Sequence, residues 1–188
     1  GLRHAIRRRR NCFQTIVVMP QSPDGVWWHD SYMERLVLSV INASVSEFNG
    51  NLRRIYLTGI SMGGYGTWFL GAKYPDKFAA IVPVCGGIVP PGLGEDQNFF
   101  GNRQLEVVTR LVNTPVWAFH GSDDKEVPVT ESRTIIEALR LVGNPAKYTE
   151  YIGIGHNSWD KAYAENELWE WLFQQSLQKK NTKSVLSL

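Results

Sequence analysis

The chain has 188 residues, of which 43% are hydrophobic, 12% aromatic and 20% charged. This composition excludes a disordered chain or a coiled coil and is typical of one globular domain. No apolar run approaches the roughly 18 residues that span a bilayer, and no signal peptide is visible. We therefore expect no membrane partner. Localisation stays open, with the cytoplasm expected only if residue 1 is near the natural start.

The net charge of +2 conceals an uneven distribution. Residues 1–11 contain five arginines and no acid, whereas the rest of the chain has more acids than bases. We interpret this basic segment as the exposed face and end of a first helix, because no aromatic residues interleave with the arginines as nucleic-acid binding would require. No nucleic-acid partner is expected. Residues 181–188 are expected to form a flexible tail.

Short apolar, β-branched runs alternate with stretches of helical spacing along the chain. In chain order they predict a strand at 16–19, a helix at 30–48, a strand at 55–58, a helix to about 74, a strand at 79–84, a weak helix at 104–111, a strand at 116–119, a helix at 130–141, a strand at 147–152 and a helix at 158–178. This alternation predicts a single α/β domain over 1–188, a three-layer sandwich with about five strands in a mostly parallel sheet.

The strongest chemical signal is Gly59-x-Ser61-x-Gly63, which stands between a predicted strand and a predicted helix. This is the nucleophile-elbow pattern in its expected context, where a sharp turn lifts the serine hydroxyl clear of the sheet. Only small residues fit beside so tight a turn. The following helix directs its free N–H groups at the same place, which suits a developing anion.

A serine nucleophile needs a base, and the base needs an acid to orient it. His156 follows the last predicted strand, while Asp123 and Asp124 follow the strand before it. The carboxyl ends of parallel strands meet at one edge, so these groups are expected near Ser61. Two neighbouring loop residues cannot both face the imidazole, and the spacing alone leaves the choice of acid open.

The other histidines and Cys85 receive structural interpretations. His120 ends a strand and is expected to hydrogen-bond locally and shape the acid loop, His4 is expected to be exposed, and His29 to cap a helix. Cys85 is expected to be a buried structural thiol, and with only one other cysteine, Cys12, a disulfide framework is excluded. No histidine pair has metal-ligand spacing, so we expect no metal.

Several motifs together resemble the serine esterase branch of the α/β-hydrolase superfamily, in the group of predicted peptidases, phospholipase/carboxylesterase-like and feruloyl-esterase-like proteins. The resemblance covers about residues 12–173 and rests on Val18-Met19-Pro20-Gln21, Gly59-Ile60-Ser61-Met62-Gly63-Gly64, Pro83-Val84-Cys85-Gly86-Gly87, Pro115-Val116-Trp117-x-Phe119-His120-Gly121, Val127-Pro128 and Gly155-His156-x-Ser158-Trp159.

The resemblance implies a Ser-His-Asp triad and no cofactor. Ser61 would be the nucleophile, His156 the base and Asp124 the acid, because Asp124 is the fifth position of the family's His-Gly-x-x-Asp-x-x-Val-Pro stretch. The backbone N–H of Met62 would donate to the oxyanion. The candidate substrate-pocket residues are Gln21, Trp27, Trp28 and Trp159, although core packing explains the two adjacent tryptophans equally well.

The chain also departs from the family pattern. Family members begin with further strands, the last of which ends in a His-Gly loop that supplies a second oxyanion N–H, and nothing like this loop precedes Ile16. The chain is thus expected to be truncated at its amino terminus relative to the family. We expect the strands at 16–19 and 55–58 to pair directly, or another chain to cover the gap, which makes a homo-oligomer a candidate.

The sequence therefore predicts a serine carboxylesterase that acts on a small ester substrate through an acyl-enzyme. Two alternatives remain open. The first is a serine peptidase or a depolymerase of polyester or feruloyl type. The second is a catalytically impaired fragment or binding module, because loss of one oxyanion donor typically costs on the order of 100- to 1,000-fold in rate.

Overall fold

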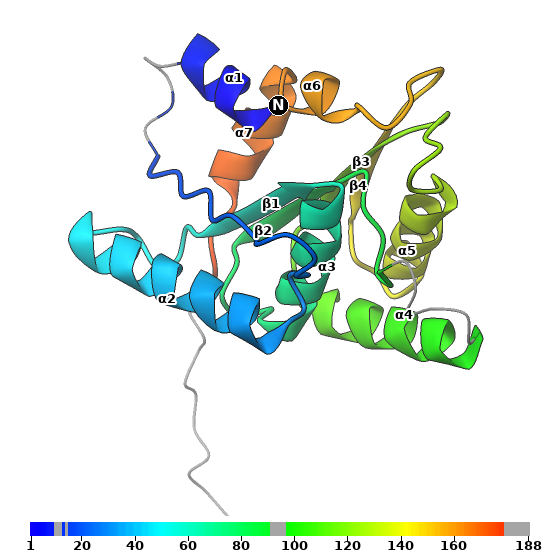
Figure 1. Cartoon of the computed structure of the whole chain (residues 1–188), viewed down its shortest axis with the longest axis horizontal. Helices are drawn as coiled ribbons and strands as arrows, with labels where there is room; N and C mark the ends of the chain where they lie inside the picture. The colour runs from blue at the N-terminus through cyan, green and yellow to red at the C-terminus, as the bar shows by residue number, and fades with distance from the viewer. Residues whose placement is uncertain (10–12, 14, 91–96, 179–188) are drawn as a thin grey trace, which may run out of the picture.

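The computed structural model describes residues 1–9, 13, 15–90 and 97–178 (Figure 1). The expected flexible tail 181–188 and residues 10–11 of the basic segment lie outside the described residues, as does Cys12. The described part contains one sheet of four parallel strands in the order β1-β2-β3-β4. The strands are β1 (Tyr56–Ile60), β2 (Ala80–Val84), β3 (Trp117–Gly121) and β4 (Lys147–Tyr151).

Helices cover both faces of the sheet (Figure 1). One layer holds α2 (Ser31–Glu47), α3 (Met62–Lys73), α4 (Gln97–Leu111) and α5 (Thr130–Leu141), and the other holds α1 (Leu2–Arg8), α6 (Trp159–Ala162) and α7 (Asn166–Gln174). Successive strand residues point to opposite faces, so Ile81 and Ala118 join one apolar cluster, whereas Val82 and Phe119 join the other. The predicted α/β sandwich with a parallel sheet is confirmed.

The periodic segments fold where the sequence predicts them. The helix predicted at 130–141 is α5, and that predicted at 30–48 is α2. The short helix predicted at 104–111 is longer at its amino end, because α4 begins at Gln97. Four of the five predicted strands form the sheet. No helix among the described residues is both long and apolar enough to cross a membrane.

The strand predicted at 16–19 is wrong. These residues have no regular secondary structure and pair with none of the described strands, and β1 is hydrogen-bonded only to β2 within the described sheet. Ile16, Val18 and Met19 are 47%, 42% and 57% exposed. A β-strand needs a neighbour to satisfy its backbone groups and a layer to bury its side chains; among the described residues this segment has no partner strand, and most of its side chains are exposed. Direct pairing with β1 is therefore contradicted, while coverage by another chain stays an expectation.

The single final helix predicted at 158–178 is also wrong, because α6 and α7 are separated by a break at 163–165. The carbonyls freed at the break accept hydrogen bonds from Arg9, far away in the sequence, and from the nearby Trp169. Arg9 donates to the carbonyls of Tyr163 and Ala164 at 3.3 and 2.7 Å, and the Trp169 indole donates to the Tyr163 carbonyl at 3.1 Å. The break lets Tyr163 enter the core, where its hydroxyl lies 2.8 Å from Oγ1 of Thr58.

Candidate active site

Ser61 lies at the junction of β1 and α3, as the elbow pattern predicts. It is the residue before the first turn of α3 and has φ 50° and ψ −117°. Residues other than glycine rarely adopt this backbone conformation. Its backbone N–H donates to the carbonyl of Val84 at 3.0 Å, which ties the turn to β2. The strained backbone therefore holds the hydroxyl in one place above the sheet edge.

The glycines around Ser61 have different reasons to be there. A Cβ at Gly59 would come within 2.2 Å of the Gly63 carbonyl oxygen, so the turn closes only on a glycine at that position. A Cβ at Gly64 would come within 2.7 Å of the Val84 carbonyl oxygen. Gly63 itself has nothing within 4 Å of such a position. The steric demand thus falls on the first glycine of the pattern and on Gly64.

His156 joins Ser61 and Asp124 in one hydrogen-bonded chain. Its Nε2 lies 2.8 Å from the Ser61 Oγ, and its Nδ1 lies 2.7 Å from the Asp124 Oδ2. The histidine loop is held against the end of β3, where Gly121 leaves room for the backbone of residues 154–155. The three residues that the sequence predicted to meet do so, although they come from three different strand ends.

The Asp124 carboxyl is buried and well supplied with donors. Its Oδ1 accepts from the backbone N–H groups of Glu126 and Val127, each at 2.9 Å, and its Oδ2 faces His156. Burial by itself raises the pKa of this carboxyl, but the hydrogen bonds from His156 and the two backbone groups outweigh it, so the pKa lies below its usual value. The group is thus an ionised acceptor at neutral pH.

Asp123 points elsewhere, which resolves the choice that spacing left open. Its carboxyl accepts from the Ser122 hydroxyl at 2.6 Å on the exposed side of the loop. Of the two neighbouring acids, Asp124 therefore faces the imidazole.

His120 shapes the acid loop, as expected. It is fully buried; its Nδ1 lies 2.7 Å from the Ser132 Oγ, and its Nε2 lies 3.0 Å from the Val127 carbonyl and 3.2 Å from the Asp124 Oδ2. Burial lowers the pKa of His120, so this imidazole is neutral at neutral pH. His120 thus connects the loop that carries Asp124 to Ser132 in α5 and stabilises the position of that loop.

Met62 is the first residue of α3, next to Ser61. The first N–H groups of a helix have no partner within the helix and carry its positive dipole end. The backbone N–H of Met62 is therefore at the position where an oxyanion donor is expected.

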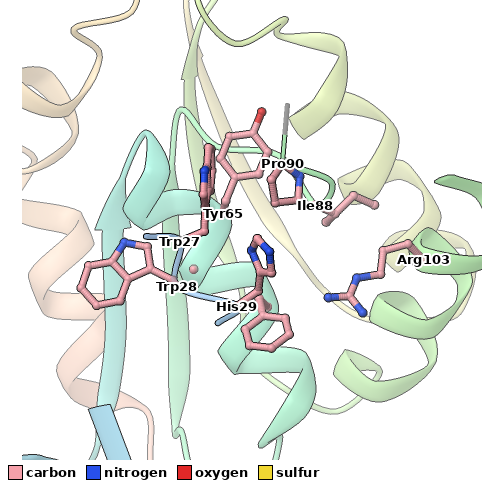
Figure 2. A pocket seen from close by; sticks show the side chains of 9 residues that line it. Trp27, Trp28, His29, Tyr65, Ile88, Pro90 and Arg103 are labelled. Carbon is pink, nitrogen blue, oxygen red and sulfur yellow. The ribbon is translucent and has the colours of Figure 1, made fainter. Parts of the chain in front are cut away.

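The predicted pocket residues separate into three groups. Trp27 and Trp28 line a small aromatic pocket with His29, Tyr65, Phe69 and Arg103 (Figure 2). Its free volume of about 10 Å³ holds roughly one water molecule, so these side chains pack chiefly on one another. Trp159 packs edge-to-face on His156 at 5.4 Å, whereas Gln21 is exposed and is not among the pocket's lining residues. His29 is a pocket residue rather than a cap, because Asp30 stands at the cap position of α2.

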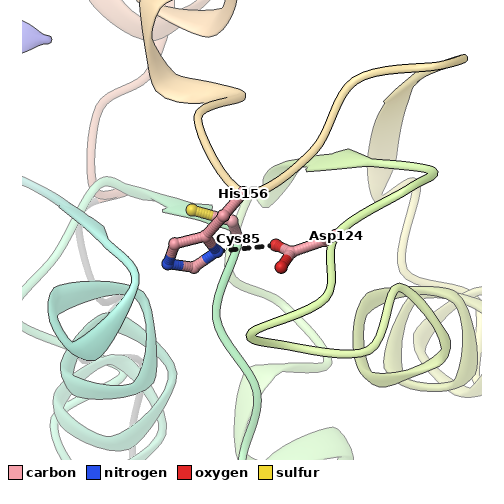
Figure 3. A group of neighbouring side chains, drawn as sticks. All are labelled: Cys85, Asp124 and His156. Atoms are coloured by element: carbon pink, nitrogen blue, oxygen red, sulfur yellow. Dashed lines mark hydrogen bonds and ion pairs between the residues drawn. The ribbon is translucent and has the colours of Figure 1, made fainter.

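Cys85 is buried, as predicted, but its neighbours were not predicted. Its Sγ, a carboxylate oxygen of Asp124 and a ring nitrogen of His156 lie within 4.8 Å of one another (Figure 3). Burial raises the pKa of the thiol to about 11, against smaller lowering contributions from the Ser61 backbone and the Ser158 side chain. The position of Cys85 directly after β2, at the edge where Ser61 and His156 meet, is the sequence signal that could have indicated this proximity.

The parallel sheet, the strained serine after β1 and the acid and histidine after β3 and β4 define the protein as an α/β hydrolase. Residues 21–166 match the model of the Phospholipase/Carboxylesterase family. The chain belongs to this family.

Similar proteins include esterases. The crystal structure of a thermostable esterase is 34% identical, superposes with a TM-score of 0.71, and matches over 84% of this chain and 43% of that one. Acetylxylan esterase A of Emericella nidulans is 31% identical over 41% of this chain and 28% of its own length. An uncharacterized secreted protein of Arthroderma benhamiae is 29% identical over 69% of this chain and 15% of its own length. The chain thus spans less than half the length of each of these proteins.

Proposed function

We propose that the chain is a serine hydrolase that cleaves carboxylic esters. The observation that carries the proposal is the hydrogen-bonded chain from Ser61 through His156 to Asp124. The 2.8 Å between Ser61 Oγ and His156 Nε2 permits proton transfer without rearrangement, and the 2.7 Å between His156 Nδ1 and Asp124 Oδ2 is a hydrogen bond that orients the imidazole. Membership of the Phospholipase/Carboxylesterase family supports the same chemistry.

In this proposal His156 Nε2 takes the proton of the Ser61 hydroxyl as Oγ forms a bond to the ester carbonyl carbon. The carbonyl oxygen becomes an oxyanion beside the Met62 N–H and the amino end of α3. Asp124 holds the Nδ1–H and stabilises the imidazolium. The alcohol leaves with the proton from Nε2, and a water activated by His156 then hydrolyses the acyl-enzyme. No metal or organic cofactor takes part.

Esters are proposed over amides because similar proteins are named esterases, among them an acetylxylan esterase and a thermostable esterase.

A fluorophosphonate probe tests the proposal without any assumption about the substrate. Such a probe phosphonylates a serine only when a base activates it. We expect mass spectrometry to find the label on Ser61, and we expect none on the Ser61→Ala or His156→Ala variants. Failure of the folded chain to label at Ser61 would contradict the proposal and favour a binding module that keeps the triad residues without their activity.

A further inference from the structure

Three potential metal ligands, one of which is His156, lie close together at the carboxyl edge of the sheet. The Cys85 thiol comes from the end of β2, the Asp124 carboxylate from the loop after β3 and His156 from the loop after β4 (Figure 3). Their ligand atoms lie within 4.8 Å of one another. Cys85 and Asp124 are buried, and His156 is partly exposed, so one side of the group faces the surface where substrate would enter.

A fourth polar group lies next to the thiol. The hydroxyl of Ser158 is fully buried and has no oxygen or nitrogen partner among the described residues, and it lies within hydrogen-bonding reach of the Cys85 thiol, whose pKa it lowers. A buried hydroxyl with so few partners is uncommon because its desolvation is poorly compensated. We call Cys85, Asp124 and His156 the Cys85 cluster, and the Ser158 hydroxyl lies beside its thiol.

The donor set of the Cys85 cluster suits a borderline or soft divalent cation. Zn²⁺ takes thiolate sulfur at about 2.3 Å and imidazole nitrogen or carboxylate oxygen at about 2.0–2.2 Å, in a tetrahedron whose corners are about 3.3–3.7 Å apart. The 2.7 Å between Nδ1 of His156 and the Asp124 oxygen would have to widen by about 0.6 Å, and the sulfur would have to approach by about 1 Å or less.

We propose that a thiophilic divalent cation such as Zn²⁺ or Cd²⁺ binds the Cys85 cluster and inhibits the hydrolase. The inhibition rests on the proposed function, whereas the binding does not. The cation bonds to the Cys85 sulfur, whose proton leaves to solvent, and to the Asp124 oxygen. It also bonds to the His156 Nδ1, so the Nδ1 proton leaves and the neutral imidazole carries its hydrogen on Nε2 instead. The Nδ1–H···Oδ2 hydrogen bond is lost and Nε2 has no free lone pair, so His156 can no longer take the proton of Ser61.

Direct binding is tested by titration of the chain with Cd²⁺, whose bond to a thiolate produces a charge-transfer band in the ultraviolet. We expect the band for the wild-type chain and for Ser61→Ala, since Ser61 is not a ligand. We expect its loss in Cys85→Ala and its retention in Cys12→Ser, the matched variant of the chain's other cysteine. A band that survives Cys85→Ala, or that vanishes with Cys12→Ser, would overturn the proposal.

Inhibition is tested on ester hydrolysis with Zn²⁺ added and then removed by a chelator. We expect reversible loss of activity with Zn²⁺ and none with Mg²⁺ or Ca²⁺, which prefer oxygen ligands. Measured against each variant's own activity without metal, Cys85→Ala and Cys85→Ser should raise the inhibitory Zn²⁺ concentration by at least about 10-fold. Inhibition of the two Cys85 variants at the same Zn²⁺ concentration as the wild type, or no inhibition of the wild type, would contradict the proposal. A chain without esterase activity that still shows the cadmium band would refute the proposed function alone.

Discussion

Two apolar segments of similar composition have opposite fates in this protein. Residues 80–84 form β2, flanked by strands on both sides and by helices on both faces, and every one of them is buried. Residues 16–19 are equally apolar and β-branched, yet Ile16, Val18 and Met19 are exposed, and the segment pairs with no strand in the described part of the chain. The contrast shows that apolar, β-branched composition specifies a strand only where the rest of the fold supplies a neighbour.

The carboxyl edge of the sheet and the segment before β1 also differ in how firmly they are held by hydrogen bonds. The carboxyl ends of β1, β3 and β4 fix Ser61, Asp124 and His156 within hydrogen-bond reach. Residues 15–19, in contrast, have no partner strand in the described chain. The proposed chemistry therefore depends on the four-stranded sheet and not on the segment before it.

The largest expected effect concerns the acid of the triad. Asp124→Asn should lower kcat by about 10⁴-fold, because an amide no longer selects the correct tautomer of His156 or stabilises its charged form. Asp123→Asn is the matched control, since the Asp123 carboxyl is exposed and accepts a hydrogen bond from Ser122. The kcat of ester hydrolysis is measured for both variants in the steady state. A comparable loss of kcat in the two variants would refute the assignment of Asp124 as the triad acid.

The next effect concerns the steric basis of the elbow. Gly59→Ala brings a methyl group within 2.2 Å of the Gly63 carbonyl oxygen and should destabilise the fold by about 3 kcal/mol or more. Gly63→Ala meets nothing within 4 Å and lies in α3, so it should be neutral or stabilising by up to about 1 kcal/mol. Urea unfolding measures both changes. Similar free energies of unfolding for the two variants would show that the turn does not close as described.

The smallest expected effects concern one valine in each of the two apolar segments. Val82 is 1% exposed and Val18 is 42% exposed. Val82→Ala should cost about 2 kcal/mol through lost burial and a residual cavity. Val18→Ala should change the free energy of unfolding by less than about 0.5 kcal/mol. The oligomeric state of each sample is measured by sedimentation. A clear loss of stability for Val18→Ala would mean that another chain or segment covers residues 16–19 in solution.

Much of this architecture follows from local pattern. The 3.6-residue period places α5 at its observed bounds, and the glycine spacing around Ser61 predicts the elbow. The meeting of Ser61 and His156 follows from the rule that parallel strands end at one edge. The choice of Asp124 over Asp123 did not follow from spacing, because neighbouring loop residues differ only in the direction that the folded loop gives them.

Other features depend on contacts between distant residues. The break between α6 and α7 relies on Arg9, which lies more than 150 positions earlier in the chain. The Cys85 cluster joins the ends of three strands, and no linear spacing encodes it. The error at residues 16–19 has the same origin, since the absence of a partner strand is a property of the whole sheet and not of the segment.

The most direct test of the account is the hydrolysis of short-chain p-nitrophenyl esters by the 188-residue chain and its Ser61→Ala variant. We predict measurable turnover by the wild-type chain and a fall on the order of 10⁴-fold in the variant. Activity of this kind would also mean that a second oxyanion donor, besides the Met62 N–H, comes from within the chain. Equal rates for the two folded proteins, or none above background for either, would contradict the proposal that Ser61, His156 and Asp124 act as a working triad.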